Sequence, residues 1–430
     1  KFLLLSTYFN QTRCTRSMKN ILIIGAGIVG ICTSIELIKK GYSVTLMDPN
    51  EPGSQTSYGN AGVITDSSLM IINNPQLLKS LFQLIFKNQT SFRYSKSFIF
   101  LRLTWVFRFL MFSHKNHMKF AAKALRELQV LSLNAHQKLI KITNSNNIIS
   151  KPGWLKLFKT SESYKKYSLE LEVLNKHKAK YTTLNTTQIE KQFPDLEVKF
   201  FKGILFKNSI RVKSPLKLSK KYFNYFIESG GKFVQESCKD LQYIEDKWVI
   251  FSNKNKSYFD QVVVSTGPWS KNILSNLGYN IPLAWERGYH HHFSTKKKIS
   301  INPAIYDVEG GFVYSSNGSD VRVTSGVELT FLDAVQNEIQ INESIQKLRK
   351  IIPLNKKLID KPWLGSRPTI IDSLPMIGKA PKHKNLWFNF GHNHIGLSTS
   401  AGSAFIISEM IQNKKTSINA DPFSPKRFSL

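Results

Sequence analysis

The chain has 430 residues, of which 41% are hydrophobic and 21% charged, so it is long enough for two domains with separate cores and is not a disordered protein. Its formal net charge is +31, and the basic residues are mostly Lys and are scattered over the whole sequence. This distribution favours the codon composition of an AT-rich genome as the origin of the charge. Contact with an anionic membrane is the second explanation, and nucleic-acid binding is the third. Three widely separated cysteines form no disulfide framework or metal-binding pair, and no apolar run is long enough to span a bilayer, so we expect a cytoplasmic protein.

The chain begins with the segment KFLLLSTYFNQTRCTRS, which precedes Met18. This segment holds only a short apolar run and no small-residue cleavage site, so it does not resemble a signal peptide. We expect Met18 to be the native start.

A βαβ unit follows in the run ILIIGAGIVGICTSIELIKKGYSVTLMD. Four apolar residues predict a buried strand, a glycine turn opens a helix with apolar residues at helical spacing, and a second strand ends at Asp48. The turn matches GxGxxG, in which the first glycine permits the tight turn, the second lets the backbone approach a pyrophosphate and the third permits close helix packing. These residues are Gly25, Ala26, Gly27, Ile28, Val29 and Gly30.

Asp48 lies where a carboxylate binds a ribose hydroxyl of a dinucleotide, and the helix amino terminus faces the phosphates. In this context the motif predicts dinucleotide binding. NAD and FAD domains share this opening, so the cofactor is decided by other parts of the chain. Residues 51–66, EPGSQTSYGNAGVITD, lack periodicity and predict a loop that lines the cofactor.

Residues 76–113 combine large apolar residues with interspersed Lys and Arg. Our favoured interpretation is a pair of amphipathic helices that pack on the body of the protein. The alternative is an anchor at a membrane surface with snorkelling basic residues, to which the net positive charge gives modest support.

The rest of the chain mixes helices and strands without a detectable repeat. We expect a helix over 118–143, mixed elements over 151–260, a strand and Gly-Pro turn over 261–270, an antiparallel sheet from Tyr289 to Val327, and a final strand, turn and helix from Leu386. The predicted fold is therefore α/β with α+β: a Rossmann-like FAD-binding domain assembled from discontinuous segments, and a substrate domain on an antiparallel sheet. We assign 18–66, 186–270 and 363–416 to the first domain, and 67–185 and 271–362 to the second.

Six motifs occur in an order that makes the sequence similar to a known family. They are GAGIVG, TSYGNAG at 56–62, VVVSTGPWS at 262–270, RGYH at 287–290, GSRPTIIDSLPMIG at 365–378 and GHNHIGLS at 391–398. From about Lys19 to about Lys415 the chain resembles the D-amino acid oxidase superfamily of FAD-dependent oxidoreductases, and within it the D-amino acid dehydrogenase-like branch.

The resemblance implies a non-covalent FAD site, since no Cys lies beyond Cys238 and no His closely follows the TSYGNAG loop. Thr56 and Ser57 would lie near the pyrophosphate, and Asn60, Ala61 and Gly62 along the flavin ring. Backbone N–H groups of the 391–398 turn, at a helix amino terminus, would stabilise negative charge on the reduced flavin. The further cofactor residues are Thr266, Gly267, Gly391, His392, Gly396, Leu397 and Ser398.

By the same resemblance Arg367 holds the substrate carboxylate, for which a guanidinium fork is better suited than a Lys. The alternative role of Arg367 is a buried ion pair with Asp372. Arg287 and Tyr289 are further catalytic candidates, on the opposite strand face from His290. The spacing of His392 and His394, and of the histidines at 290–292, does not suit a metal, so we expect none.

These features predict oxidative deamination of a small amino acid, with a D-amino acid favoured, by hydride transfer to FAD. We expect electrons to pass to a quinone or other carrier, with peripheral contact to the inner face of the cell membrane. One alternative is an FAD oxidase that uses O₂ on glycine, sarcosine or D-proline-like amines. Another is an NAD-dependent dehydrogenase, which the first motif alone would permit.

Overall fold

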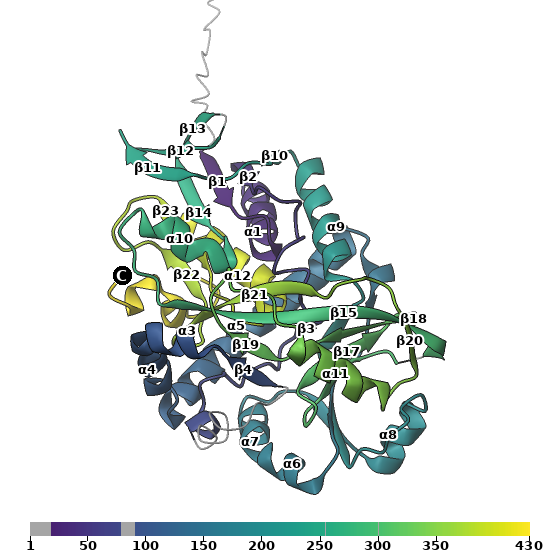
Figure 1. The fold of residues 1–430 in the computed structure, drawn as a ribbon. Coiled ribbons are helices and arrows are strands. Elements are labelled where there is room, and N and C mark those ends of the chain that lie inside the picture. The colour runs from purple at the N-terminus through teal and green to yellow at the C-terminus, as the bar shows by residue number, and fades with distance from the viewer. Residues whose placement is uncertain (1–18, 79–90, 254, 300) are drawn as a thin grey trace, which may run out of the picture.

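The structure is a computed structural model that describes residues 19–78, 91–253, 255–299 and 301–430 (Figure 1). The expectation for Met18 lies outside these ranges, as does that for residues 79–90 of the amphipathic segment. Within the described ranges, every helix is too short or too polar to cross a bilayer.

The first sheet has six strands in the order β10-β2-β1-β14-β23-β22 and is parallel except for its last pair. Alternate residues of its central strand are buried on opposite faces, which explains the unbroken apolar run ILII. The strands are β1 (Asn20–Ile24), β2 (Ser43–Met47), β10 (Lys232–Val234), β14 (Gln261–Val264), β22 (Met376–Lys379) and β23 (Leu386–Phe390).

Helices cover one face of this sheet, and a small antiparallel sheet packs on the other. The helices are α1 (Ile28–Lys39), α5 (Lys115–Ile142), α9 (Pro215–Glu228) and α12 (Gly396–Ile411). The small sheet contains β11 (Asp240–Ile244), β12 (Lys247–Phe251) and β13 (Lys256–Phe259), at the top of Figure 1. The predicted βαβ unit is confirmed, with Asp48 directly after β2.

The second large sheet has eleven strands and is organised around β15 (Leu283–Ile299), which crosses the middle of the molecule (Figure 1). Nine strands follow the order β4-β19-β15-β18-β17-β16-β6-β8-β7, and β20 and β21 also pair with β15. Besides β15 they are β4 (Phe92–Tyr94), β6 (Trp154–Phe158), β7 (Tyr181–Asn185), β8 (Lys202–Phe206), β16 (Ala304–Asp307), β17 (Phe312–Ser316), β18 (Gly318–Thr324), β19 (Val327–Leu329), β20 (Leu354–Lys357) and β21 (Trp363–Ile370).

This sheet is mostly antiparallel, so the predicted fold class is confirmed. Its strands β8 and β21 lie in segments that we grouped with the FAD-binding domain, because strand pairing across distant segments leaves no local mark in a sequence.

The remaining described strands and α-helices lie outside the two large sheets and their covering helices. The strands are β3 (Val63–Thr65), β5 (Ile149–Ser150) and β9 (Ser209–Val212), which form a small sheet. The helices are α3 (Lys96–Leu101), α4 (Leu103–Met111), α6 (Ser161–Lys166), α7 (Ser168–Lys176), α8 (Thr186–Gln192), α10 (Ser270–Ser275) and α11 (Ile339–Arg349).

Helices α3 and α4 each bury one side against the body of the protein, as the amphipathic interpretation expects. Phe98, Trp105 and Phe109 join the core on the far side of the six-stranded sheet from α1. The Trp105 indole N–H donates a 3.1 Å hydrogen bond to the Pro282 carbonyl, which ties α4 to the start of β15.

The glycine turn generates a stability prediction at Gly30. A Cβ added there would lie 1.8 Å from the Gly25 carbonyl oxygen, so we expect Gly30→Ala to lower the free energy of unfolding by more than about 2 kcal/mol through steric overlap. Gly396→Ala is the control, because its Cβ would meet only the His392 Cβ at 3.5 Å. Equal thermal melting of the two variants would contradict the expectation.

Candidate active site

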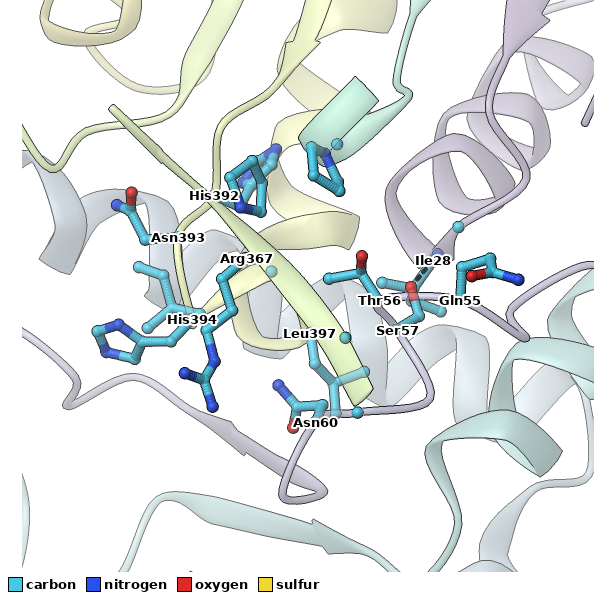
Figure 2. A pocket seen from close by; sticks show the side chains of 18 of the residues that line it. Ile28, Gln55, Thr56, Ser57, Asn60, Arg367, His392, Asn393, His394 and Leu397 are labelled. Atoms are coloured by element: carbon cyan, nitrogen blue, oxygen red, sulfur yellow. Dashed lines mark hydrogen bonds between the residues drawn. The ribbon is translucent and has the colours of Figure 1, made fainter. Parts of the chain in front are cut away.

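A cavity of about 820 Å³ runs between the carboxyl ends of β1 and β2 and the face of the eleven-stranded sheet (Figure 2). One end lies against Asp48 and the glycine turn, and the other against Arg367 and strands β6 and β16. The volume is in the range of small-molecule sites. The cavity therefore joins the two parts of the molecule that the sequence assigned to cofactor and substrate.

At the first end, backbone and loop groups are held in fixed positions at the amino terminus of α1. The Ile28 N–H donates a 2.9 Å hydrogen bond to the Ser57 hydroxyl oxygen, which fixes the 56–62 loop over the helix terminus (Figure 2). The Asp48 carboxylate accepts 2.8 Å hydrogen bonds from the N–H groups of Ala26 and Asn50, while burial raises its pKa. A helix amino terminus that is bordered by a carboxylate suits a phosphate followed by a ribose.

Most of the residues predicted to bind the cofactor line this cavity. They are Gly25, Gly27, Ile28, Val29, Asp48, Thr56, Ser57, Asn60, Ala61, Thr266, Gly267, Gly391, His392, Gly396, Leu397 and Ser398. Ala26, Gly30 and Gly62 do not line it. Gly62 has a φ of +79°, and a Cβ there would lie 2.2 Å from the Val212 carbonyl oxygen. This glycine therefore lets the loop turn and pack closely on the backbone of Val212, on the side away from the cavity.

The turn that precedes α12 lies at the middle of the cavity. Its residue His392 is buried, with Nδ1 2.9 Å from the Thr399 hydroxyl and Nε2 3.2 Å from the Asn389 side-chain oxygen. Ser398 accepts from the Thr65 N–H at 3.2 Å and donates to the Val63 carbonyl at 3.1 Å. These bonds fix the amino terminus of α12 against the cavity.

Arg367, on β21, lies at the second end of the cavity (Figure 2). Its Nη1 donates to the Gly326 carbonyl at 3.3 Å, and no carboxylate of the described chain lies within ion-pair distance of it. A Cβ at Gly288 would lie 2.3 Å from Arg367 Nη2, so this glycine leaves the space that the guanidinium occupies. The alternative partner Asp372 pairs instead with Arg427 at 2.7 Å.

Arg287 and Tyr289 do not line the cavity. Arg287 is fully buried and donates to Glu328 at 3.1 Å, to the Tyr289 hydroxyl at 2.8 Å and to the carbonyls of Ala334 and Val335. Both side chains lie on the face of β15 that points away from the cavity. We therefore assign them to the support of β15 and no longer expect them to contact substrate.

Comparisons with known proteins agree with this geometry. The profile of the DAO family, described as FAD-dependent oxidoreductase, matches residues 20–410. The chain belongs to this family. A D-amino-acid oxidase of Bradyrhizobium diazoefficiens is 27% identical over 421 residues, which cover 95% of this chain and 99% of the relative.

Solved structures of the same fold span nearly the whole chain. Glycine oxidase from Geobacillus kaustophilus has a TM-score of 0.75 at 15% identity and covers 96% of this chain and 100% of its own. L-Proline dehydrogenase from P. horikoshii has a TM-score of 0.71 at 18% identity and covers 96% and 98%. At these identities the likeness shows a shared fold.

The residues at the first end of the cavity fit the FAD of the DAO family. Gly27 is open to the cavity, with Ser57 Oγ 3.3 Å from the position of an added Cβ, so the backbone can approach a pyrophosphate closely. FAD is thus the cofactor of this family member, and the nicotinamide alternative is set aside. No cluster of three or more metal-ligating side chains occurs in the described ranges.

Sequence reasoning missed a row of cavity-lining residues from five strands of the large sheet. Strand register places Lys156 on β6 beside Tyr306 on β16, and this pairing continues through Val313 on β17 to Thr324 on β18. The row ends at Trp363 on β21, which stacks on His290 with ring centroids 4.8 Å apart. These residues are far apart in the sequence, and only the register brings them together.

Glu286 was also missed, although it lies directly opposite Arg367 in the β15–β21 pairing. Burial raises the pKa of this carboxyl to about 7, and the positive charge of Arg367 only partly opposes that increase. Below this pH Glu286 is neutral and leaves the Arg367 charge free for an anionic ligand.

The raised pKa predicts a pH dependence of stability. At pH values between the ordinary pKa of a carboxyl group and about 7, Glu286 of the folded protein keeps a proton that the unfolded chain releases. The contribution of Glu286 to the free energy of unfolding therefore falls as pH rises through this window, by on the order of 3 kcal/mol. We expect Glu286→Gln to reduce this fall when unfolding is measured from pH 5 to pH 8. The exposed Glu228→Gln is the control, and parallel pH profiles of both variants and the unaltered protein would contradict the assignment.

Proposed function

We propose that this protein catalyses oxidative deamination of a small amino acid, with a D-amino acid as the favoured substrate class. The observation that carries the proposal is Arg367, a half-buried guanidinium that pairs with no carboxylate of the described residues, at the far end of a cavity that fits FAD. The D-amino-acid oxidase relative and the glycine oxidase and L-proline dehydrogenase folds support an amino acid or amine as substrate.

Arg367 binds the substrate carboxylate through its planar donor fork and fixes the orientation of the Cα–H bond. FAD, when bound, supplies the acceptor for the hydride. Loss of that hydride from Cα and of a proton from the amino group produces an imine, which water hydrolyses to a keto acid and ammonia. The chain supplies orientation and a site covered by aromatic side chains such as Trp363 and Tyr306.

We propose a quinone or other carrier as electron acceptor, in keeping with the D-amino acid dehydrogenase-like motifs. The alternative is an oxidase that uses O₂ on glycine, sarcosine or D-proline-like amines, which the D-amino-acid oxidase relative and the glycine oxidase structure favour. A quinone resides in lipid, so a quinone acceptor requires a protein surface that contacts a membrane.

An exposed apolar surface supports contact with a membrane. The α3/α4 patch consists of large hydrophobic side chains that are 56–74% exposed: Phe100, Leu101, Leu103, Phe107 and Met111. Exposed basic residues, among them Lys96 and Arg108, lie on the same helices, and the sequence contains no Asp or Glu from Ser67 to Arg126. Exposed apolar side chains on a segment with basic and no acidic residues suit an anionic lipid surface.

We therefore propose peripheral binding to the inner face of the cell membrane through this patch, with the rest of the protein in the cytoplasm. In Figure 1, α3 and α4 lie at the lower left, away from β11–β13 at the top. Ser91, which precedes α3 by five residues, lines the cavity. The patch is thus connected by a short stretch of chain to the wall of the active site.

The function predicts a yellow protein whose flavin band is bleached anaerobically by one compound from a panel of D-amino acids, D-hydroxyproline, glycine and sarcosine. Arg367→Gln should keep its colour but be reduced about a hundredfold more slowly at low substrate, because the carboxylate loses a charge-assisted hydrogen bond. Arg108→Gln, on the exposed side of α4, should behave as the unaltered protein. A colourless preparation that does not take up FAD would refute the proposal.

The α3/α4 patch predicts co-sedimentation with vesicles that contain phosphatidylglycerol, less with pure phosphatidylcholine, and less at high salt. Replacing Phe100 and Phe107 together by Ser should weaken binding at least about tenfold through the lost apolar area. The matched control replaces the exposed Ile244 and Tyr258 by Ser, at the opposite end of the molecule. Equal binding by both double variants would argue against the patch.

A further inference from the structure

We propose that His394 receives the amino group of the substrate while Arg367 holds its carboxylate, an assignment that rests on the proposed function. The first observation is the direction of the side chain. Figure 2 shows His392 and His394 pointing in different directions from the same turn, with the Arg367 guanidinium on the side of His394. His392 is buried and fully hydrogen-bonded, whereas His394 retains an exposed side chain that lines the cavity.

The chain is built to hold this direction. Asn393, between the two histidines, has a φ of +48°, in the left-handed region. Its side chain accepts from the Ile370 N–H at 3.2 Å and donates to the Ser373 carbonyl at 2.8 Å, and its own N–H donates to the Pro368 carbonyl at 3.1 Å. These contacts tie the turn to the end of β21, the strand that carries Arg367. His394 and Arg367 are therefore positioned by one connected structure.

The imidazole of His394 is neutral and has a free acceptor. His394 is exposed to the cavity, but the protein around it replaces bulk water, and this desolvation, followed by the positive charges of Arg367 and Lys156, lowers its pKa to about 4. No hydrogen bond from a described residue reaches either ring nitrogen. A neutral imidazole carries one nitrogen that accepts a hydrogen bond.

Two other polar groups at this end of the cavity are already engaged. The Lys156 ammonium pairs with the Glu170 carboxylate at 2.7 Å, and the Gly326 carbonyl accepts from Arg367. An α-amino group is separated from its carboxylate by a single carbon atom, so a carboxylate on Arg367 places the amino group among these residues. The acceptor nitrogen of His394, which no described protein group uses, can then accept a hydrogen bond from the amino N–H of the substrate. The contact of the carboxylate with Arg367 and that of the amino group with His394 together fix the direction of the Cα–H bond.

Two ligands of nearly equal shape test this contact. Pyrrole-2-carboxylate presents an N–H beside its carboxylate, and furan-2-carboxylate presents an oxygen there. Dissociation constants for the FAD-loaded protein come from the shift of the flavin absorption band, without turnover. We expect the pyrrole to bind about three- to tenfold more tightly, the range that one hydrogen bond gives.

Substitutions then assign the preference to one side chain. His394→Leu should bring the ratio of the two dissociation constants close to one, and His394→Gln, whose amide oxygen is an acceptor, should restore much of it. Arg367→Lys should weaken both ligands and leave the ratio unchanged. His177→Leu, outside the cavity, is the matched histidine control.

The outcomes distinguish the role of His394 from the proposed function on which it rests. A ratio that His394→Leu leaves unchanged, with both ligands still bound, would overturn the role of His394 and leave the proposed function intact. Failure of both ligands to perturb the flavin of the unaltered protein would overturn the carboxylate site and the role of His394 together. A loss of the ratio in His394→Leu, with flavin content unchanged, would establish the contact.

Discussion

The active site depends on the register of β15 against β21. In this pairing Glu286 lies opposite Arg367, and Gly288 lies opposite Gly365. The side chain of Arg367 occupies the space over Gly288, and burial raises the pKa of the Glu286 carboxyl opposite it to about 7. A shift by one residue would turn Arg367 to the other face of the sheet. The network of Arg287, Tyr289 and Glu328 on that other face therefore supports the site by securing β15.

The cavity exists because two different sheets meet with their functional groups toward each other. The six-stranded sheet contributes backbone: the glycine turn, the amino terminus of α1 and the start of α12. The eleven-stranded sheet contributes side chains, from Lys156 to Trp363, in one row across its strands. Backbone donors suit phosphates and a flavin, which are common to all members of the family, whereas side chains can vary with the substrate. This division also explains why the row of side chains from Lys156 to Trp363 forms no single motif in the sequence.

The sequence predicted what is encoded locally. The glycine turn, Asp48, the 56–62 loop and the 391–398 turn each lie in one short segment with its own spacing, and the fold class follows from the order of elements. Arg367 was placed by resemblance. Glu286, Tyr306 and Trp363 were not predicted, because their meeting depends on pairing between distant strands. His394 was considered only as a metal ligand, since i and i+2 spacing does not reveal that Asn393 turns the chain between the two histidines.

The cofactor sheet combines the two ends of the chain, which constrains how the protein is made. Helix α1 packs against α12, where the Cys32 thiol lies 3.8 Å from the Ser400 hydroxyl, and against β23, from which Asn389 donates to Thr33 at 3.0 Å. During synthesis the βαβ unit emerges well before α12, yet its apolar helix face remains uncovered until α12 has left the ribosome. Contacts of such long sequence separation form slowly. The nascent chain therefore has a period of aggregation risk in which a chaperone would shield α1, and a product truncated before α12 would remain unable to retain flavin.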